Sequence, residues 1–400
     1  MSEFEAERER RRFAVRVSLL FAAIAAIIGT SMPYLPVWLD WTGLSASEIA
    51  VITATPLLVR MVVTPAIAFA ADRAGDHRKF LIGLSWAGLL ALLALAQARG
   101  FWLILLWMLF FSLAWTTIMP LTETVAMSGV RAAGLDYGRM RLWGSLSFIA
   151  ASFVGGLVVE RLGAGSAIWL VVIGAALTTA AAHGLAQPIG LGRLKAATSP
   201  PRLSLADAAS LVRSRRFLIF LAAAGLTSAS HAVFYTFGTL QWRSVGLSTG
   251  WSGTLWAISI VAEIALFAYS AAVVARIGPV ALIALGAGAA IVRWLAMGFD
   301  PPLALLVVLQ LLHALTFGAT HIGAVHFISR AVPETQSGTA QALYASVTGG
   351  VVMGGTMLAA GPLYAAYGGR AYWAMAAVAA VALLASFALM KLEPRRALPA

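Results

Sequence analysis

The chain has 400 residues, of which 60% are hydrophobic and 11% charged, and its formal net charge is +12. Soluble domains carry roughly 25% charged residues, so this composition excludes an ordinary water-soluble globular protein. The sequence contains no cysteine, which excludes disulfides and cysteine chemistry. We therefore expect a protein whose solvent is the lipid bilayer.

Apolar runs of about 20 residues, each long enough to cross a hydrocarbon layer of about 30 Å, recur along the chain. They predict an all-α membrane protein with twelve transmembrane helices. The expected spans lie near residues 14–36, 47–71, 79–98, 101–128, 141–160, 164–185, 217–239, 248–275, 278–298, 302–327, 336–362 and 368–390. The first is too long for a secretory signal, so we interpret it as an uncleaved helix.

The positions of the basic residues decide what the net charge means. Most lie in the N-terminal segment, in every second loop and in the C-terminal segment. The exceptions are four in the opposite loops (Arg99, Arg161, Arg243 and Arg370) and two inside spans (Arg60 and Arg293). This asymmetry follows the positive-inside rule and predicts that both termini are cytoplasmic. The basic charge therefore indicates membrane topology, and we expect no nucleic-acid partner.

Residues 186–216 combine Gly, Pro and Ser with six basic residues and separate six predicted spans from six more. We interpret this segment as a cytoplasmic linker between an N-terminal half, residues 1–185, and a C-terminal half, residues 217–400. Weak internal echoes about half the chain length apart support a duplication. Two six-helix halves are typical of secondary transporters, whose substrate site lies near the bilayer midplane between the halves.

The second loop, AADRAGDHRKF at residues 70–80, resembles the cytoplasmic signature of the major facilitator superfamily. Asp72, Arg73 and Gly75 match it, whereas Ala68 stands where a glycine is usual and the basic pair comes late. The resemblance implies the major facilitator fold. It also implies that this loop is a latch, in which an acid and a base hold the cytoplasmic side closed.

Charged residues inside spans are functional candidates, because a charge at the bilayer centre costs about 2.5–3.5 kcal/mol on insertion scales. The candidates are Glu123, Glu263, Arg60 and Arg293, together with Arg141 at the start of the fifth span and His313 within the tenth. This set resembles the lactose permease branch and the related phenylpropionate permease family. The resemblance implies substrate binding by Glu123 and Arg141, and proton coupling by Glu263, Arg293 and His313.

Departures from lactose permease argue against a galactoside. Phe148 stands where that branch stacks its sugar on tryptophan, Thr316 replaces an acid, and residues 226–238 lack the paired acids of the seventh span. The pattern YGRMRLWGSLSF, at residues 137–148, is closer to the phenylpropionate permease group. We therefore favour an aromatic carboxylate as the substrate.

Charge gives an independent reason for the same preference. The three inside arginines exceed the two inside acids by one, so a substrate anion could supply the missing partner. Arginine presents a planar fork that binds carboxylates in bidentate fashion. We assign Arg60 and Phe148 to substrate contact beside Glu123 and Arg141. A structural pair between Arg60 and Glu123 is the alternative for Arg60.

Glu263 is the expected proton carrier, and Arg293 the switch that approaches and leaves it. His313 orients or relays the proton, or is simply a buried, hydrogen-bonded histidine. For His231 we favour that structural interpretation.

These observations predict a proton-coupled symporter of the bacterial cytoplasmic membrane that imports a small organic solute. We expect it to use the proton gradient without a cofactor or metal and to work as a monomer. A nucleoside or sugar symporter and a proton-driven drug exporter are the alternatives. An enzyme is not expected, since no metal-ligand cluster, nucleophile–base motif or cofactor loop occurs in the sequence. A non-transporting sensor is the remaining alternative, and it would be expected to carry an added soluble output domain.

Overall fold

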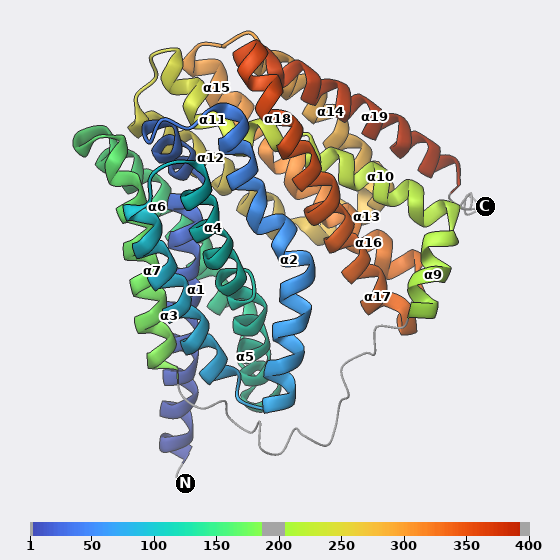
Figure 1. Cartoon of the computed structure of the whole chain (residues 1–400). Helices are drawn as coiled ribbons and strands as arrows, with labels where there is room; N and C mark the ends of the chain where they lie inside the picture. Colours follow the sequence, from blue (N-terminus) through green and yellow to red (C-terminus); the bar gives the residue numbers. More distant parts are fainter. Residues whose placement is uncertain (1–2, 186–204, 393–400) are drawn as a thin grey trace, which may run out of the picture. The chain divides into compact units, whose positions relative to one another are not determined.

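The computed structural model describes residues 3–185 and 205–392, and every regular element in these ranges is a helix. The predicted all-α class is therefore confirmed. Before residue 186 the elements are α1 (Glu3–Trp41), α2 (Ala46–Ala74), α3 (His77–Gln97), α4 (Phe101–Trp115), α5 (Ile118–Ala133), α6 (Tyr137–Leu162), the 3₁₀ turn η1 (Ala164–Ser166) and α7 (Ala167–Gly184) (Figure 1).

The elements after residue 204 are shorter and include two π-helices, η2 and η3. In order they are α9 (Leu205–Arg213), α10 (Arg215–Ala229), α11 (Ala232–Ser244), α12 (Thr249–Ala268), α13 (Ser270–Ile277), α14 (Pro279–Met297), α15 (Leu303–Leu311), η2 (Ala314–Ala319), α16 (Thr320–Ala331), α17 (Glu334–Tyr344), η3 (Ala345–Val352), α18 (Met353–Tyr367), the 3₁₀ turn η4 (Gly368–Arg370) and α19 (Ala371–Lys391).

Among the described residues, eleven continuous helical segments are long and apolar enough to span a membrane. The last two predicted spans fall within one 58-residue segment, Glu334–Lys391, whereas one crossing needs about 20 residues. Gly368, with φ of 55°, interrupts this segment between α18 and α19. A count of twelve crossings and the cytoplasmic position of the termini stay predictions.

The helices form two compact units. The first contains α1 to α7 and Tyr235–Ala257, and the second contains α9, α10, the following residues to Phe234, and the chain from Ile258 onward. Contacts in the first unit explain why Tyr235–Ala257 belongs to it: the Glu160 carboxylate accepts a hydrogen bond from the Gly250 N–H at 2.7 Å. Of the predicted linker 186–216, residues 186–204 lie outside the described residues.

Small residues on α1 allow this helix to run close to α6 and α7. A Cβ atom on Gly29 would lie 2.7 Å from the backbone oxygen of Phe148, and the Ser152 hydroxyl donates to the Gly29 carbonyl at 2.9 Å. On α7, a Cβ atom on Gly174 would lie 2.7 Å from the Ile27 side chain. Small residues are the usual means of close helix packing in membranes, where lipid tails remove the hydrophobic drive between helices.

Two loops of the first unit have the same pair of capping residues, a glycine that ends one helix and an aspartate that begins the next. In the α2–α3 loop, Gly75 takes the left-handed conformation (φ 67°) and Asp76 caps α3 by accepting the Lys79 N–H at 3.0 Å. In the α5–α6 loop the corresponding residues are Gly134 (φ 61°) and Asp136. Glycine avoids the steric cost of this conformation, and aspartate satisfies an otherwise unpaired N–H. These ends fix where α6 begins, and hence the position of Arg141.

Candidate functional site

Arg293 on α14 is completely buried in the second unit and donates to three side chains. Its Nη1 atom donates to His313 Nδ1 at 3.1 Å and to Thr316 Oγ1 at 3.1 Å. Its Nη2 atom donates to Gln310 Oε1 at 2.7 Å. A buried charge is tolerated only when hydrogen bonds replace its water shell, and these neighbours supply several of them.

Two aromatic rings also face the Arg293 guanidinium. Its Cζ atom lies 4.7 Å from the centre of the Phe234 ring and 4.6 Å from that of Trp294, within the range of cation–π attraction. The indole N–H of Trp294 donates to Ser230 Oγ at 2.9 Å. The ring is therefore held in place by its own hydrogen bond, and it limits the movement of the guanidinium.

His313 connects Arg293 to an acid. Arginine can only donate, so His313 Nδ1 must accept and the proton of the neutral ring must sit on Nε2. That nitrogen lies 3.6 Å from Oε2 of Glu263. Glu263, His313 and Arg293 thus form a continuous series, which brings together the three residues that the sequence assigned to proton coupling.

His231 lies on the other side of the same group. Its Nδ1 atom is 3.2 Å and 3.0 Å from the backbone oxygens of Thr227 and Ser228, so Nδ1 carries the proton. Nε2 then accepts from the Thr316 hydroxyl at 2.9 Å, and that hydroxyl accepts from Arg293. Since Nδ1 and Nε2 both have partners, His231 holds the position and proton arrangement of Thr316.

Gln310 closes the group, which we call the Arg293 network: Glu263, His231, Arg293, Gln310, His313 and Thr316. Its Oε1 atom accepts from Arg293 and also lies 3.0 Å from the Ser259 hydroxyl, which fixes the amide orientation, since the opposite orientation would face one donor with another. Its Nε2 atom is buried and has no hydrogen-bond partner among the described residues.

His313 and Thr316 lie on the same side of their helix because they are three residues apart. His313 is the residue before the π-helix η2, and Thr316 lies inside it. In a π-helix the hydrogen bonds span one residue more than in an α-helix, and such insertions are frequent at functional sites. No sequence feature predicted η2, although Gly318 within it contributes to the local packing: a Cβ atom there would lie 3.0 Å from Leu266.

In the first unit, Glu123 on α5 and Arg141 on α6 are brought together by Tyr137. The Tyr137 phenol interacts with both the Glu123 carboxylate and the Arg141 guanidinium. The Arg141 Cζ atom lies 5.6 Å from the centre of the Phe21 ring, and Phe21 meets Tyr137 edge to face at 6.2 Å. We call these four residues the Arg141 cluster. Glu123, Tyr137 and Arg141 are all partly exposed.

The other predicted substrate residues stand apart from this cluster. Phe148 lies two turns along α6, with 9% of its surface exposed, and its backbone packs on Gly29. Arg60 on α2 is exposed, and no hydrogen bond or ion pair links it to Glu123 within the described residues. Substrate contact by either residue stays a prediction.

The predicted latch is described in part. Arg73 is exposed in the last turn of α2, and Gly75 forms its left-handed end. The side chain of Asp72 lies outside the described part of the structure. Among the described residues of this loop, the ion pair is instead between Asp76 and Lys79, at 3.1 Å.

Five residues of these groups were not assigned to the site from sequence: Gln310, Thr316, His231, Tyr137 and Phe21. Thr316 was noted as a departure from an acid, and His231 was interpreted as structural. Gln310 precedes His313 by three residues, so helical spacing offered a signal for it. Tyr137 lies at the start of an apolar span, and no sequence signal distinguishes it from an interfacial tyrosine.

Long apolar helices that carry a few charged groups are typical of multi-pass membrane transporters. Residues 15–375 match the MFS_1 like family, and the chain belongs to this family. The resemblance to the major facilitator superfamily that the sequence motifs indicated is therefore confirmed.

Similar proteins are all transporters. The probable 3-phenylpropionic acid transporter of Escherichia coli is 31% identical over 363 residues, which cover 89% of this chain and 92% of the relative. Maltose permease of Geobacillus stearothermophilus is 29% identical over 83% of each chain, and the putative nucleoside transporter YegT of Escherichia coli is 25% identical over 54% of this chain and 52% of its own length. The crystal structure of the nucleoside transporter NupG superposes with a TM-score of 0.83 at 19% identity, covering 95% of this chain and 100% of that one.

Proposed function

We propose that this chain is a proton-coupled symporter that imports an aromatic carboxylate of the phenylpropionate type by alternating access. The observation that carries the coupling is the buried series Glu263–His313–Arg293. The 31% identical relative named as a 3-phenylpropionic acid transporter supports the substrate class.

In this mechanism Glu263 carries the proton. When the carboxylate is ionised, its charge and that of Arg293 balance across His313. Protonation removes the negative charge and leaves Arg293 with a net positive field in a poorly hydrated region, where charge interactions are strong. A bound anionic substrate then offsets this charge in the protein as a whole. Proton and anion therefore favour each other's binding, which is the thermodynamic requirement for symport.

We assign substrate recognition to the Arg141 cluster. A guanidinium can hold a carboxylate with two parallel hydrogen bonds, and the buried Phe21 ring supports the Arg141 guanidinium from one side. Arg60 and Phe148 complete the proposed contacts. Glu123 and Tyr137 position the Arg141 fork, since both interact with this part of the cluster.

The proposal includes a membrane arrangement. Twelve crossings place both termini in the cytoplasm of a bacterium, with the protein in its inner membrane, and Asp72, Arg73 and Gly75 form the cytoplasmic latch. The transporter works as a monomer, driven by the proton gradient without a cofactor, and carries out no enzymatic reaction.

A nucleoside is the second candidate substrate, because one relative carries the name of a putative nucleoside transporter. The two substrate classes differ in charge, and this difference gives the decisive experiment. One proton moving with one carboxylate carries no net charge, whereas one proton moving with a neutral nucleoside carries one positive charge.

The test uses purified protein in proteoliposomes with an imposed pH difference or an imposed membrane potential. For the carboxylate we expect accumulation that follows the pH difference, about tenfold per pH unit, and no response to the potential. A neutral substrate would also respond to the potential, which contributes about 2.3 kcal/mol per charge per 100 mV. Accumulation of a nucleoside driven by potential, with no uptake of phenylpropionate, would overturn the proposed substrate. Uptake that ignores both gradients would overturn the coupling.

A further inference from the structure

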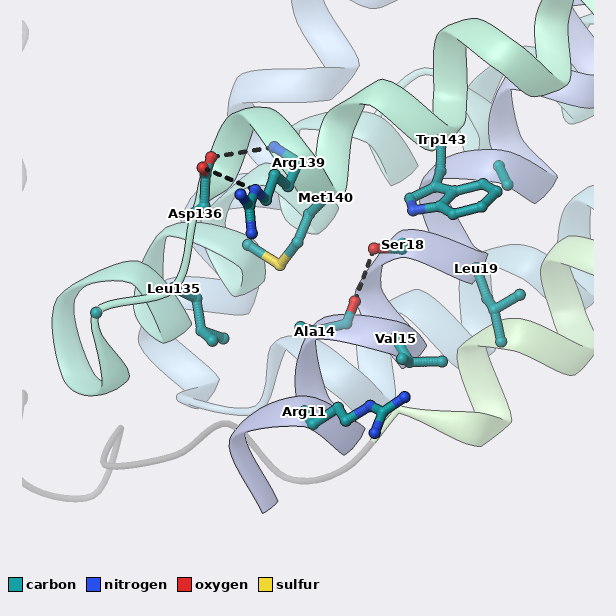
Figure 2. Close-up of a pocket in the computed structure, with 12 residues that line it drawn as sticks. Arg11, Ala14, Val15, Ser18, Leu19, Leu135, Asp136, Arg139, Met140 and Trp143 are labelled. Carbon is teal, nitrogen blue, oxygen red and sulfur yellow. Dashed lines mark hydrogen bonds and ion pairs between the residues drawn. The ribbon is translucent and has the colours of Figure 1, made fainter. Parts of the chain in front are cut away.

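Two adjoining grooves run along the exposed flank of α1 in the first unit. The first, about 590 Å³ in volume, lies between α1 and the start of α6 (Figure 2). The second, about 430 Å³, lies between α1, α6 and α7. The first is lined by Arg11, Ala14, Val15, Ser18, Leu19, Ala22, Gly134, Leu135, Asp136, Arg139, Met140 and Trp143, and the second by Arg16, Leu19, Ala22, Ala23, Ala26, Ser147, Leu177, Ala180, Ala181 and Gly184.

Leu19 and Ala22 line both grooves, so they form a ridge between two parallel channels. Helical spacing explains this arrangement: residues three and four apart share a face, so α1 presents two neighbouring stripes on either side of the ridge. The stripes extend over twelve and eleven residues of α1, which corresponds to about 15 Å along the helix axis. That length matches one leaflet of a hydrocarbon core of about 30 Å.

Both grooves begin at an arginine. Arg11 is the first α1 residue of one groove and Arg16 the first of the other. Both are exposed, and neither forms an ion pair within the described residues. Arg139 of α6 adds a third guanidinium to the first groove (Figure 2), with Asp136 at 3.6 Å. The positive-inside rule places this end of α1 at the cytoplasmic surface, where anionic lipid headgroups lie.

Beyond the arginines the grooves offer apolar surface and no spare hydroxyl. Ser18 donates to the Ala14 carbonyl at 2.8 Å, and Ser147 donates to the Ala22 carbonyl at 2.7 Å. Leu19 and Trp143 are 58% and 57% exposed, like other apolar side chains on the outer surface of this chain. The interiors therefore suit acyl chains and not a polar solute.

We propose that these grooves bind one two-chain anionic phospholipid. Its phosphate lies between Arg11 and Arg16, and one acyl chain follows each groove on either side of Leu19 and Ala22. Two arginines at the expected position of the phosphate, and two apolar channels of leaflet length, together favour a phospholipid with one anionic headgroup and two acyl chains. The proposal is independent of the transported substrate.

Native mass spectrometry of the purified protein tests the site with phosphatidylglycerol, phosphatidylcholine, lyso-phosphatidylglycerol and glycerol phosphate. We expect one phosphatidylglycerol to bind more tightly than each of the other three. The double variant Arg11→Gln/Arg16→Gln should weaken this binding about tenfold, in line with the attraction of surface arginines to anionic lipid.

Two further variants separate the site from general surface charge. Arg276→Gln/Arg330→Gln removes two exposed arginines that line neither groove and are also predicted to be cytoplasmic, and it should leave binding unchanged. Ala22→Leu keeps every charge but fills the ridge between the channels, and it should weaken binding of the two-chain lipid. Equal binding of phosphatidylcholine, glycerol phosphate or the single-chain lipid would overturn the proposal. So would equal loss in the two double variants, or unchanged binding in Arg11→Gln/Arg16→Gln.

Discussion

The Arg293 network and the Arg141 cluster each join an arginine to a glutamate through one intervening side chain, but they differ in burial. Arg293 is completely buried and donates to three side chains, whereas Arg141 is partly exposed and interacts with Tyr137 and Phe21. A buried charge needs fixed partners, since the loss of its water shell is costly. A partly exposed one can exchange water for a ligand.

This difference suggests a division of roles between the two groups. In the Arg293 network every change of protonation alters a field that water does not screen, which suits coupling. In the Arg141 cluster the charge remains accessible, which suits recognition of a carboxylate. The following predictions test this division, and each compares one group with the other.

The largest effect is expected from Glu263→Gln, because glutamine keeps the shape of the side chain but carries no proton. Accumulation against a gradient should fall to the level of equilibration, while exchange of substrate across the membrane continues. Paired uptake and counterflow assays in proteoliposomes measure both. Glu160→Gln is the control, since Glu160 binds the Gly250 N–H and a glutamine oxygen can accept the same bond. Accumulation that persists in Glu263→Gln would remove this residue from coupling.

Removal of the buried charge should cost the most stability. Arg293→Gln removes the buried donor to His313, Thr316 and Gln310, and each buried acceptor left unpaired costs about 1–3 kcal/mol. The same change at Arg141 should cost less than about 1 kcal/mol, the range of exposed pairs. Thermal unfolding of the two variants in detergent compares them directly. Equal losses of melting temperature would show that the two groups do not differ in burial as the structure indicates.

The composition and motifs were sufficient to predict much of this picture, because lipid imposes strong rules. A helix must satisfy its own backbone hydrogen bonds in a bilayer, so apolar runs predicted the helices. Rare charges in spans identified Glu263, Arg293 and His313, which the structure places in contact. The resemblance to the major facilitator superfamily is confirmed by the match over residues 15–375.

Other features could not be read from sequence because they depend on packing across helices. Glycine and small residues indicated close approach, but not that the η2 π-helix would place Thr316 beside Arg293. Gln310 and Tyr137 are ordinary polar residues in an apolar chain, and only their contacts with Arg293 and Arg141 distinguish them. By contrast, the expected break between the spans 336–362 and 368–390 coincides with Gly368, between α18 and α19, although both lie in one continuous helical segment, Glu334–Lys391.

A smaller effect, on substrate affinity, is expected at the Arg141 cluster. Arg141→Lys keeps the charge but loses the planar fork, so substrate affinity should fall about tenfold, in line with the loss of one charge-assisted hydrogen bond. Arg139→Lys is the matched control, since Arg139 lies two residues away on the same helix and pairs with Asp136. Substrate-induced thermal shifts give both affinities. Unchanged affinity in Arg141→Lys would exclude the fork from binding.

The smallest effect is expected at Asp76, a partly exposed carboxylate outside the predicted spans, which provides a reference for both groups. The Lys79 backbone N–H that it caps, at 3.0 Å, lowers the pKa of this carboxyl, and the Lys79 ammonium and the Arg78 charge lower it further, while partial burial opposes them. A lowered folded-state pKa means that the charged cap stabilises above the unfolded value of about 3.9, and that this stabilisation disappears as pH falls through the lower folded value. Asp76→Ala should therefore cost about 1 kcal/mol near pH 7 and progressively less below pH 4.

Asp76→Asn separates charge from capping in the same measurement. Asparagine caps a helix about as well as aspartate but does not titrate, so this variant should retain most of the stability at pH 7 and show less pH dependence than the parent between pH 5 and 3. Melting temperatures across that range compare the three proteins. If Asp76→Asn and Asp76→Ala lose the same stability at every pH, then the contribution of Asp76 is its charge alone. In that case a partly exposed carboxylate acts through electrostatics in this protein, and the partial exposure of Arg141 would not by itself distinguish the Arg141 cluster from the Arg293 network.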